Sequence, residues 1–360
     1  MITSIEIRNI NSISNAYLSF AKGRYHYLDE FTLNDAVANP IAIYGRNGSG
    51  KSSLLNVFNN IISLMTADAE SMFSFIPNLS DADTGESSHV KICFKLGTID
   101  YEYVVEMDFD GIINETLKKK EKVILIRTSD SYEYEGKTHE FQKGFYPALR
   151  EVANKTNQNN SINRAYSFLS NMAFIGGDRK KYRLKSFGYT PYRDKMVEKS
   201  SEVKEILRSY GSFPVYDVFS ETDKTGEKSY SVRIEKENTS FVLPLELASI
   251  GMQNQSFLLT VLLSLPEEGV LIVDELESAL HPLSIYNFLK VAVKKGVQLI
   301  FSSHNTNILS KLRPDNVVFS NWKDGSSNYH RLSDIYPNIR EVNNIEKMYL
   351  SSTFDEEIEK

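Results

Sequence analysis

Residues 45 to 52 form the pattern best suited to binding a charged ligand. They read GRNGSGKS and fit the phosphate-loop pattern G-x-x-x-x-G-K-[ST]. Its glycines let the backbone curl so that N–H groups point inward at an anion. Lys51 adds positive charge for the outer phosphates, and the Ser52 hydroxyl suits Mg²⁺. The residues predicted to bind a nucleotide are Gly45, Arg46, Asn47, Gly48, Ser49, Gly50, Lys51, Ser52 and Ser53.

The segments on either side of this loop meet the requirements of the motif. The apolar run IAIY at 41–44 predicts a buried strand before the loop. Residues 52–65, SSLLNVFNNIISLM, carry apolar side chains at helical spacing and predict a helix after it. The loop would therefore hold its anion at the positive end of a helix, which a chance glycine turn would not do.

Two carboxylates supply the second half of the expected site. Residues 269–275, GVLIVDE, predict a buried strand that ends in Asp274 and Glu275, at the sheet edge where α/β proteins bind ligands. We expect Asp274 to hold magnesium together with Ser52, and Glu275 to polarise the water that attacks the γ-phosphate. Without a phosphate loop upstream, an acidic turn would explain this pair equally well.

The next predicted strand, GVQLIFSSH at 296–304, ends in a histidine. His304 would lie one strand beyond the acidic pair, close enough to sense the γ-phosphate and its loss. Lys51, Glu275 and His304 form the predicted catalytic set. The alternative for His304 is a structural or surface role.

A second anion site is predicted at Ser249 to Gln253, SIGMQ, at the start of a helix. A serine hydroxyl and a glycine amide at a helix N-terminus bind anions. Within one chain the first loop already holds the phosphates. We therefore expect Ser249, Gly251 and Gln253 to contact a γ-phosphate held by a second copy of the chain. A plain helix cap is the alternative.

In this order, the four elements resemble the ABC-type ATPase heads of the SMC, RecF and OLD-like group, often described as AAA-type in bacteria. Ser278 to Pro282, SALHP, is similar to the D-loop of that group, and NNIEKMYLSSTF at 343–354 is similar to the C-terminus of its compact members. The resemblance implies ATP and Mg²⁺ as cofactors, hydrolysis of ATP to ADP and phosphate, and two heads that close around bound ATP.

The chain departs from the pattern of this group in two places. Ile250 stands where the LSGGQ signature of transporters has glycine, so transport is not expected. Neither Gln142 nor Gln158, in the intervening region, has the context of the Q-loop glutamine. Arg8 is a candidate contact for adenine or the α-phosphate, with a solvated strand end as the alternative.

The predicted fold is α/β, a P-loop NTPase head of the ABC type. It would combine a mostly parallel core sheet, an antiparallel β subdomain of three or four strands and a short helical insertion. The predicted parts are 1–95 and 229–330 as the two halves of the head, 96–142 as the antiparallel meander, 143–228 as the mostly helical insertion and 331–360 as the C-terminal tail.

Composition limits the remaining classes of protein. The 360 residues are 41% hydrophobic and 24% charged with a net charge of −6, which allows a sizeable core and argues against a uniformly basic surface. The single cysteine, Cys93, excludes an intrachain disulfide and suits a reducing cytoplasm. No apolar stretch reaches the roughly 18 residues needed to cross a bilayer. We therefore expect a soluble, cytoplasmic protein without membrane contact.

One stretch, GGDRKKYRLKSFGYTPYRDK at 176–195, interleaves basic and aromatic residues. Such mixtures suit nucleic-acid backbones and also acidic protein partners, and a solvated basic face is the alternative. The candidate contacts are Arg179, Lys180, Lys181, Arg183 and Lys185.

The preferred functional hypothesis is an ATPase whose head dimerisation, as a homodimer or higher homo-oligomer, controls a separately encoded effector in bacterial anti-phage defence. Its warrant is analogy with compact heads of this kind rather than chemistry. The alternative is a RecF- or SMC-like DNA-binding ATPase in DNA repair, for which nucleic acid would be the partner.

Overall fold

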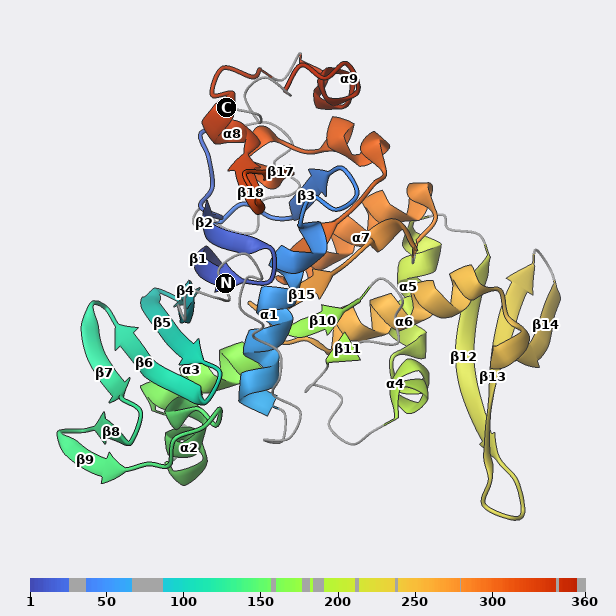
Figure 1. Cartoon of the computed structure of the whole chain (residues 1–360). Helices are drawn as coiled ribbons and strands as arrows, with labels where there is room; N and C mark the ends of the chain where they lie inside the picture. Colours follow the sequence, from blue (N-terminus) through green and yellow to red (C-terminus); the bar gives the residue numbers. More distant parts are fainter. Residues whose placement is uncertain are drawn as a thin grey trace.

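Three sheets and nine α-helices make up the described part of the protein (Figure 1). The computed structural model describes residues 1–25, 37–66, 87–156, 160–176, 182–183, 191–210, 214–236, 239–278, 280–340 and 343–354. Within these ranges, every helix is too short or too polar to cross a lipid bilayer.

The central sheet has seven strands in the order β11-β10-β15-β16-β3-β17-β18. The five inner strands are parallel, and the two edge strands pair antiparallel. The bounds are β11 (Tyr182–Arg183), β10 (Ala173–Ile175), β15 (Val270–Val273), β16 (Gln298–Ser302), β3 (Ile41–Gly45), β17 (Val317–Lys323) and β18 (Ser326–Arg331). The predicted mostly parallel core sheet is thus confirmed, and the strand β15, the helix α7 (Pro282–Lys294) and the strand β16 form its strand–helix–strand unit.

An antiparallel sheet of eight strands contains both the first two strands and the meander. Its order is β2-β1-β4-β5-β6-β7-β8-β9. The bounds are β1 (Ile2–Ile10), β2 (Ile13–Ser19), β4 (Ser88–Leu96), β5 (Ile99–Asp108), β6 (Gly111–Lys119), β7 (Lys122–Arg127), β8 (Ser131–Tyr134) and β9 (Lys137–Glu140).

The meander has six strands, β4 to β9, so the expectation of three or four was wrong. The strand β9 is exposed at every position and therefore has no apolar alternation to reveal it. The strand β6 does not alternate regularly between apolar and polar residues, and it ends in two lysines that are also typical of a solvated turn. The part boundary proposed between 95 and 96 falls at the last residue of β4, inside this sheet.

Nine helices and a small third sheet complete the part of the fold that the structure describes. The helices are α1 (Lys51–Thr66), α2 (Ala148–Lys155), α3 (Ser161–Ser170), α4 (Tyr192–Glu198), α5 (Ser200–Ser209), α6 (Ile250–Ser264), α7 (Pro282–Lys294), α8 (Leu332–Ile335) and α9 (Ile345–Leu350). Short 3₁₀ helices are η5 (Leu245–Leu247), η6 (Leu276–Ser278), η7 (Thr306–Lys311) and η8 (Pro314–Asn316). The third sheet is antiparallel, in the order β12 (Val215–Thr222), β13 (Lys228–Lys236) and β14 (Thr239–Pro244).

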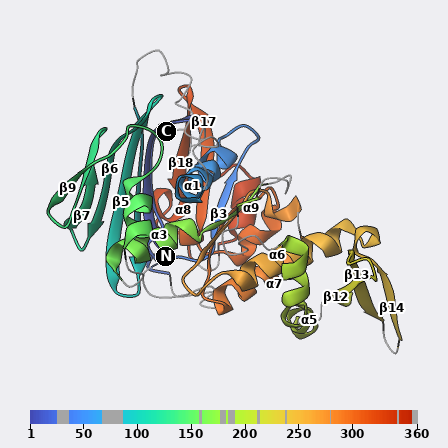
Figure 2. The same cartoon turned by 90° about the horizontal axis from the view of Figure 1, so that it is seen from below.

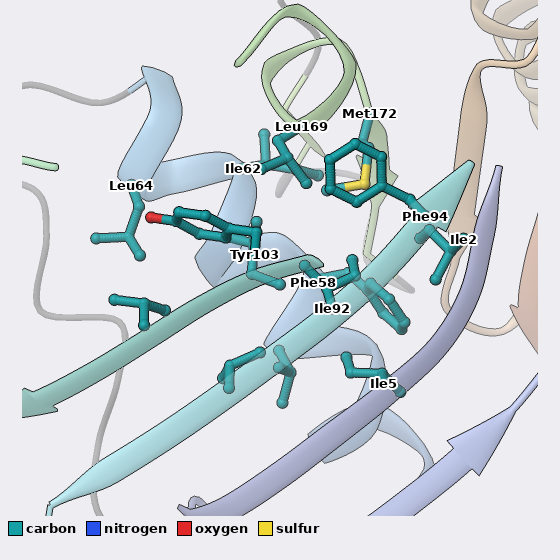
Figure 3. Packing of buried hydrophobic residues seen from close by; sticks show 14 of the residues in the cluster. Ile2, Ile5, Phe58, Ile62, Leu64, Ile92, Phe94, Tyr103, Leu169 and Met172 are labelled. Carbon is teal, nitrogen blue, oxygen red and sulfur yellow. The ribbon is translucent and has the colours of Figure 1, made fainter. Parts of the chain in front are cut away.

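Two hydrophobic cores lie on opposite faces of the central sheet. In β3, Ile43 packs into one core while its neighbours Ala42 and Tyr44 pack into the other, as alternation along a strand requires. The first core joins the eight-stranded sheet, α1 and α3, as Phe58, Ile92 and other labelled side chains in Figure 3 illustrate. The second core includes buried residues of α6 and α7. Figure 2 shows the consequence: the eight-stranded sheet and the small sheet lie at opposite ends of the molecule.

Candidate functional site

The phosphate loop connects β3 to α1 at the carboxyl edge of the central sheet. Gly48 and Gly50 have φ angles of +78° and +101°, in the region that favours glycine. At Gly50 a side chain is also excluded sterically, because a Cβ would lie 2.1 Å from Ser327 Oγ on β18. Glycine is therefore required here for two reasons: the backbone conformation of the loop and the close packing of the β17–β18 hairpin against it.

Lys51 lies at the first residue of α1 and is 7% exposed. Its ammonium donates to two carbonyls of its own loop, Gly45 O at 2.9 Å and Arg46 O at 3.0 Å. Burial lowers the pKa of Lys51, and the carboxylates of Asp274, Glu277 and Glu275 oppose that shift. The lysine is thus held at the phosphate loop by interactions that an anionic ligand can replace.

The acidic pair follows β15, which lies beside β16, and β16 lies beside β3. Ser302, the last residue of β16, is fully buried and contacts both acidic residues. Its hydroxyl donates to Asp274 Oδ1 at 2.5 Å and accepts from the Glu275 N–H at 2.8 Å. Glu275 has a φ of +55°, an uncommon conformation for a residue other than glycine, and this serine helps to hold it.

A third carboxylate lies next to the acidic pair. Glu277 Oε1 accepts from the backbone N–H of His304 at 2.7 Å. Its Oε2 is buried and has no hydrogen-bond partner among the described residues. Glu277 therefore fixes the loop that carries His304 and leaves an unpaired carboxylate oxygen in the same region.

A cavity of about 430 Å³ brings most of the predicted site residues together. Its lining includes Lys51, Ser52, Asp274, Glu275 and His304 from the ends of three adjacent parallel strands. A cationic side chain, a curled backbone, a serine hydroxyl and a carboxylate are the donor set expected for phosphates with Mg²⁺. The residues present therefore fit a magnesium–nucleotide complex.

The cavity has one lining residue that the sequence analysis did not select. Ser12 comes from the turn between β1 and β2, and its hydroxyl donates to Ser53 Oγ at 2.7 Å. The same hydroxyl lies 2.7 Å from Ser327 Oγ. A lone serine carries no motif, so only the fold could reveal its place.

The hairpin of β17 and β18 supports the phosphate loop from below. Tyr329 donates its hydroxyl to Gly50 O at 2.8 Å. Ser320 and Ser49, both almost fully buried, lie with their hydroxyl oxygens 2.6 Å apart. These contacts span more than 270 positions of sequence, and together they fix the C-terminal half of the loop.

The signature turn, Ser249 to Gln253, lies at the N-terminus of α6 and contributes nothing to the lining of this cavity. Ser249 is the N-cap, and its hydroxyl accepts from Met252 N at 3.3 Å. Gln253 donates its side-chain amide to Ala248 O at 2.9 Å. Ser249 and Gly251 are nevertheless exposed, and a Cβ at Gly251 would meet open space. The turn is both a helix cap and an accessible backbone surface.

The remaining candidates lie elsewhere. Arg8, on β1, forms an ion pair with Glu6 and lines neither this cavity nor the larger one that residues 45–49 of the loop line. The carbonyl of Gln142, at the end of the eight-stranded sheet, accepts from Arg127. Arg183 lies in β11, whereas Arg179, Lys180, Lys181, Lys185 and Gln158 fall outside the described residues.

Two solved structures are similar to this chain. The SMC head domain from Thermotoga maritima has 14% sequence identity and a TM-score of 0.48, covering 92% of this chain and 98% of that one. An SmcHead bound to the C-winged helix domain of ScpA has 14% identity and a TM-score of 0.50, covering 91% and 97%. No curated protein matches the chain in sequence.

A family model matches residues 41–310, which include the phosphate loop, the signature turn, the acidic pair and His304. The fold is that of an SMC/ABC-type ATPase head, as the sequence predicted. The chain belongs to the family described as "AAA domain, putative AbiEii toxin, Type IV TA system".

Proposed function

We propose that the protein binds and hydrolyses ATP at the cavity that the phosphate loop lines together with Asp274 and Glu275. The observation that carries this proposal is the meeting, in one cavity, of Lys51 and Ser52 after β3 with Asp274 and Glu275 after β15, two parallel strands separated only by β16. Lys51 would exchange the two loop carbonyls for the β- and γ-phosphates. Ser52 and Asp274 would hold Mg²⁺, which neutralises charge that develops on the phosphates when bound.

Glu275 is positioned to orient the attacking water. Its backbone is held in a left-handed conformation by Ser302, which is consistent with a carboxylate that must point in one direction. His304 lines the same cavity, and its backbone is tied to Glu277. Loss of the γ-phosphate would therefore change the contacts of the loop that follows β16.

We propose further that two copies close around ATP, with each signature turn capping the nucleotide of the partner. Ser249 and Gly251 are exposed, and neither lines the cavity of its own chain. A helix N-terminus with free N–H groups attracts an anion, and the γ-phosphate of a second copy supplies one. ATP would then act as a removable link, since hydrolysis removes the shared phosphate.

The closed heads would control a separately encoded effector in the bacterial cytoplasm, in anti-phage defence. Two findings support this context: the family description names a putative toxin of a toxin–antitoxin system, and one similar head is described in complex with a domain of another protein. DNA binding rests on the stretch at 176–195, most of which lies outside the described residues, and it stays a prediction.

The Glu275→Gln variant tests the proposal. It should bind ATP, hydrolyse it slowly and accumulate as a dimer in sedimentation velocity, because the amide cannot activate water. A second variant, Glu275→Gln with Ser249→Arg, should bind ATP as a monomer. If Glu275→Gln sediments identically with and without saturating ATP, the shared-site model is wrong.

A further inference from the structure

Exposed apolar side chains gather at two places beside the proposed nucleotide link. The described residues include ten large apolar side chains that are exposed, and four of them flank Ser249 or line a cavity together with the phosphate loop. Leu247 lies in η5, and Ile250 lies in the signature turn. Trp322 and Leu350 lie on β17 and α9. Such clustering marks an interaction surface more often than scattered exposure does.

The first place is a cavity of about 780 Å³ between the phosphate loop, β17 and α9, here called the aromatic cavity. Residues 45–49 of the loop line one side of it. Its lining includes the buried Phe319, which stacks on Tyr349 with ring centroids 5.2 Å apart and planes 8° apart. Trp322 and Leu350 also line this cavity, with 55% and 65% of their surfaces exposed. The cavity thus offers an apolar surface directly beside the proposed nucleotide.

The second place is the pair of side chains that flanks Ser249. Leu247 and Ile250 are 73% and 75% exposed. Their neighbours Leu245 and Ala248 are buried, so the backbone between them is anchored and the two apolar side chains are held outward. The helix cap at Ser249 fixes the start of α6 in the same way. The backbone that carries Leu247 and Ile250 is therefore already fixed in the single chain.

We infer that Leu247 and Ile250 of one copy enter the aromatic cavity of a second copy when the heads close. The inference rests on the proposed ATP-linked dimer. Closure would bring each Ser249 over the partner's phosphate loop, and residues 45–49 of that loop line the aromatic cavity. A side chain one or two positions from Ser249 then meets the cavity. A two-fold axis makes this contact twice in each dimer.

The arrangement gives ATP and apolar contact separate roles in closure. The phosphate would align the two copies and dictate when they meet, and the apolar side chains would supply lasting contact area. An empty site would leave the aromatic cavity and Leu247 in water, and the dimer would open. A separately encoded protein is the other candidate occupant of the cavity.

Trp322 is the only tryptophan of the chain and reports directly on its own environment. In Glu275→Gln, ATP should shift its emission to shorter wavelength as the cavity fills, and the shift should follow dimer formation. Adding Leu247→Asp should remove the shift and weaken dimerisation at least about tenfold, because a desolvated carboxylate would enter the cavity. Val123→Asp alters an exposed apolar residue on the eight-stranded sheet and should change neither readout.

Cross-linking tests the same contact between chains. Leu247→Cys and Leu350→Cys would be made separately in Glu275→Gln with Cys93→Ser, the only native cysteine being removed. With ATP and an oxidant, the mixture should give a disulfide-linked dimer that neither variant gives alone. If Glu275→Gln dimerises with ATP but shows no emission shift and no mixed disulfide, the inference fails while the proposed function stands. Absence of any ATP-dependent dimer would instead overturn the proposed function.

Discussion

Replacing Ser302 by alanine tests whether one buried hydroxyl aligns the acidic pair. The hydroxyl donates to Asp274 Oδ1 and accepts from the Glu275 N–H, and it is shielded from water. An uncharged hydrogen bond contributes about 1 kcal/mol and one to a carboxylate about 2 kcal/mol. Loss of about 3 kcal/mol, if expressed wholly in the transition state, corresponds to a rate reduction of about 150-fold.

We expect Ser302→Ala to lower kcat by about ten- to a hundredfold, because part of the lost energy will affect stability instead. Affinity for ATP should change little, since Lys51 and the phosphate loop are untouched. Single-turnover hydrolysis and a nucleotide titration separate the two effects. The matched control is Ser303→Ala, which removes an equally buried hydroxyl that accepts from Asn305 N at 3.0 Å. If Ser302→Ala folds and hydrolyses ATP as fast as this control, the positioning argument is wrong.

Three further predictions concern the phosphate loop. Lys51→Ala should lose ATP binding in calorimetry and keep its thermal stability, and normal binding would refute the assignment of the loop. Burial lowers the pKa of Lys51, and a triphosphate prefers the charged lysine, so ATP affinity should weaken as the pH rises toward that pKa, at a pH below the usual lysine value near 10.4. A constant ATP affinity across this pH range would contradict the prediction. Any ATP affinity retained by Lys51→Arg should be independent of pH. Tyr329→Phe should weaken ATP binding about fivefold by removing about 1 kcal/mol from loop positioning, whereas Tyr336→Phe, which removes a hydroxyl bonded to Thr353 O at 2.8 Å, should not.

The sequence predicted the parts of the site that combine a motif with strong periodicity. The runs before Gly45 and Asp274 are apolar without interruption, and such runs indicate buried parallel strands. Apolar spacing predicted a helix from residue 52, one residue after α1 begins, and the segment from Ser249 to Gln253 was predicted at the start of a helix, where α6 begins at Ile250. Adjacency of β15, β16 and β3 then placed the acidic pair and His304 beside the loop.

The supporting contacts could not be predicted, because each joins isolated polar residues across the whole chain. Ser12 and Ser327 are 315 positions apart and touch only after β18 packs against the β1–β2 turn. Ser302 looked like the end of an apolar strand, although its hydroxyl contacts the Asp274 carboxylate and the Glu275 backbone N–H. Single serines have neither period nor motif, so their roles depend on the finished fold.

Mixing two inactive variants tests the central claim most directly. Lys51→Ala removes the phosphate-loop charge, and Ser249→Arg blocks the signature turn. Each alone should form no working site. A mixed dimer would pair the intact phosphate loop of the Ser249→Arg chain with the intact signature turn of the Lys51→Ala chain. The account predicts that ATP hydrolysis reappears on mixing. Continued inactivity of the mixture, with both chains folded and Ser249→Arg still binding ATP, would contradict a nucleotide shared between two copies.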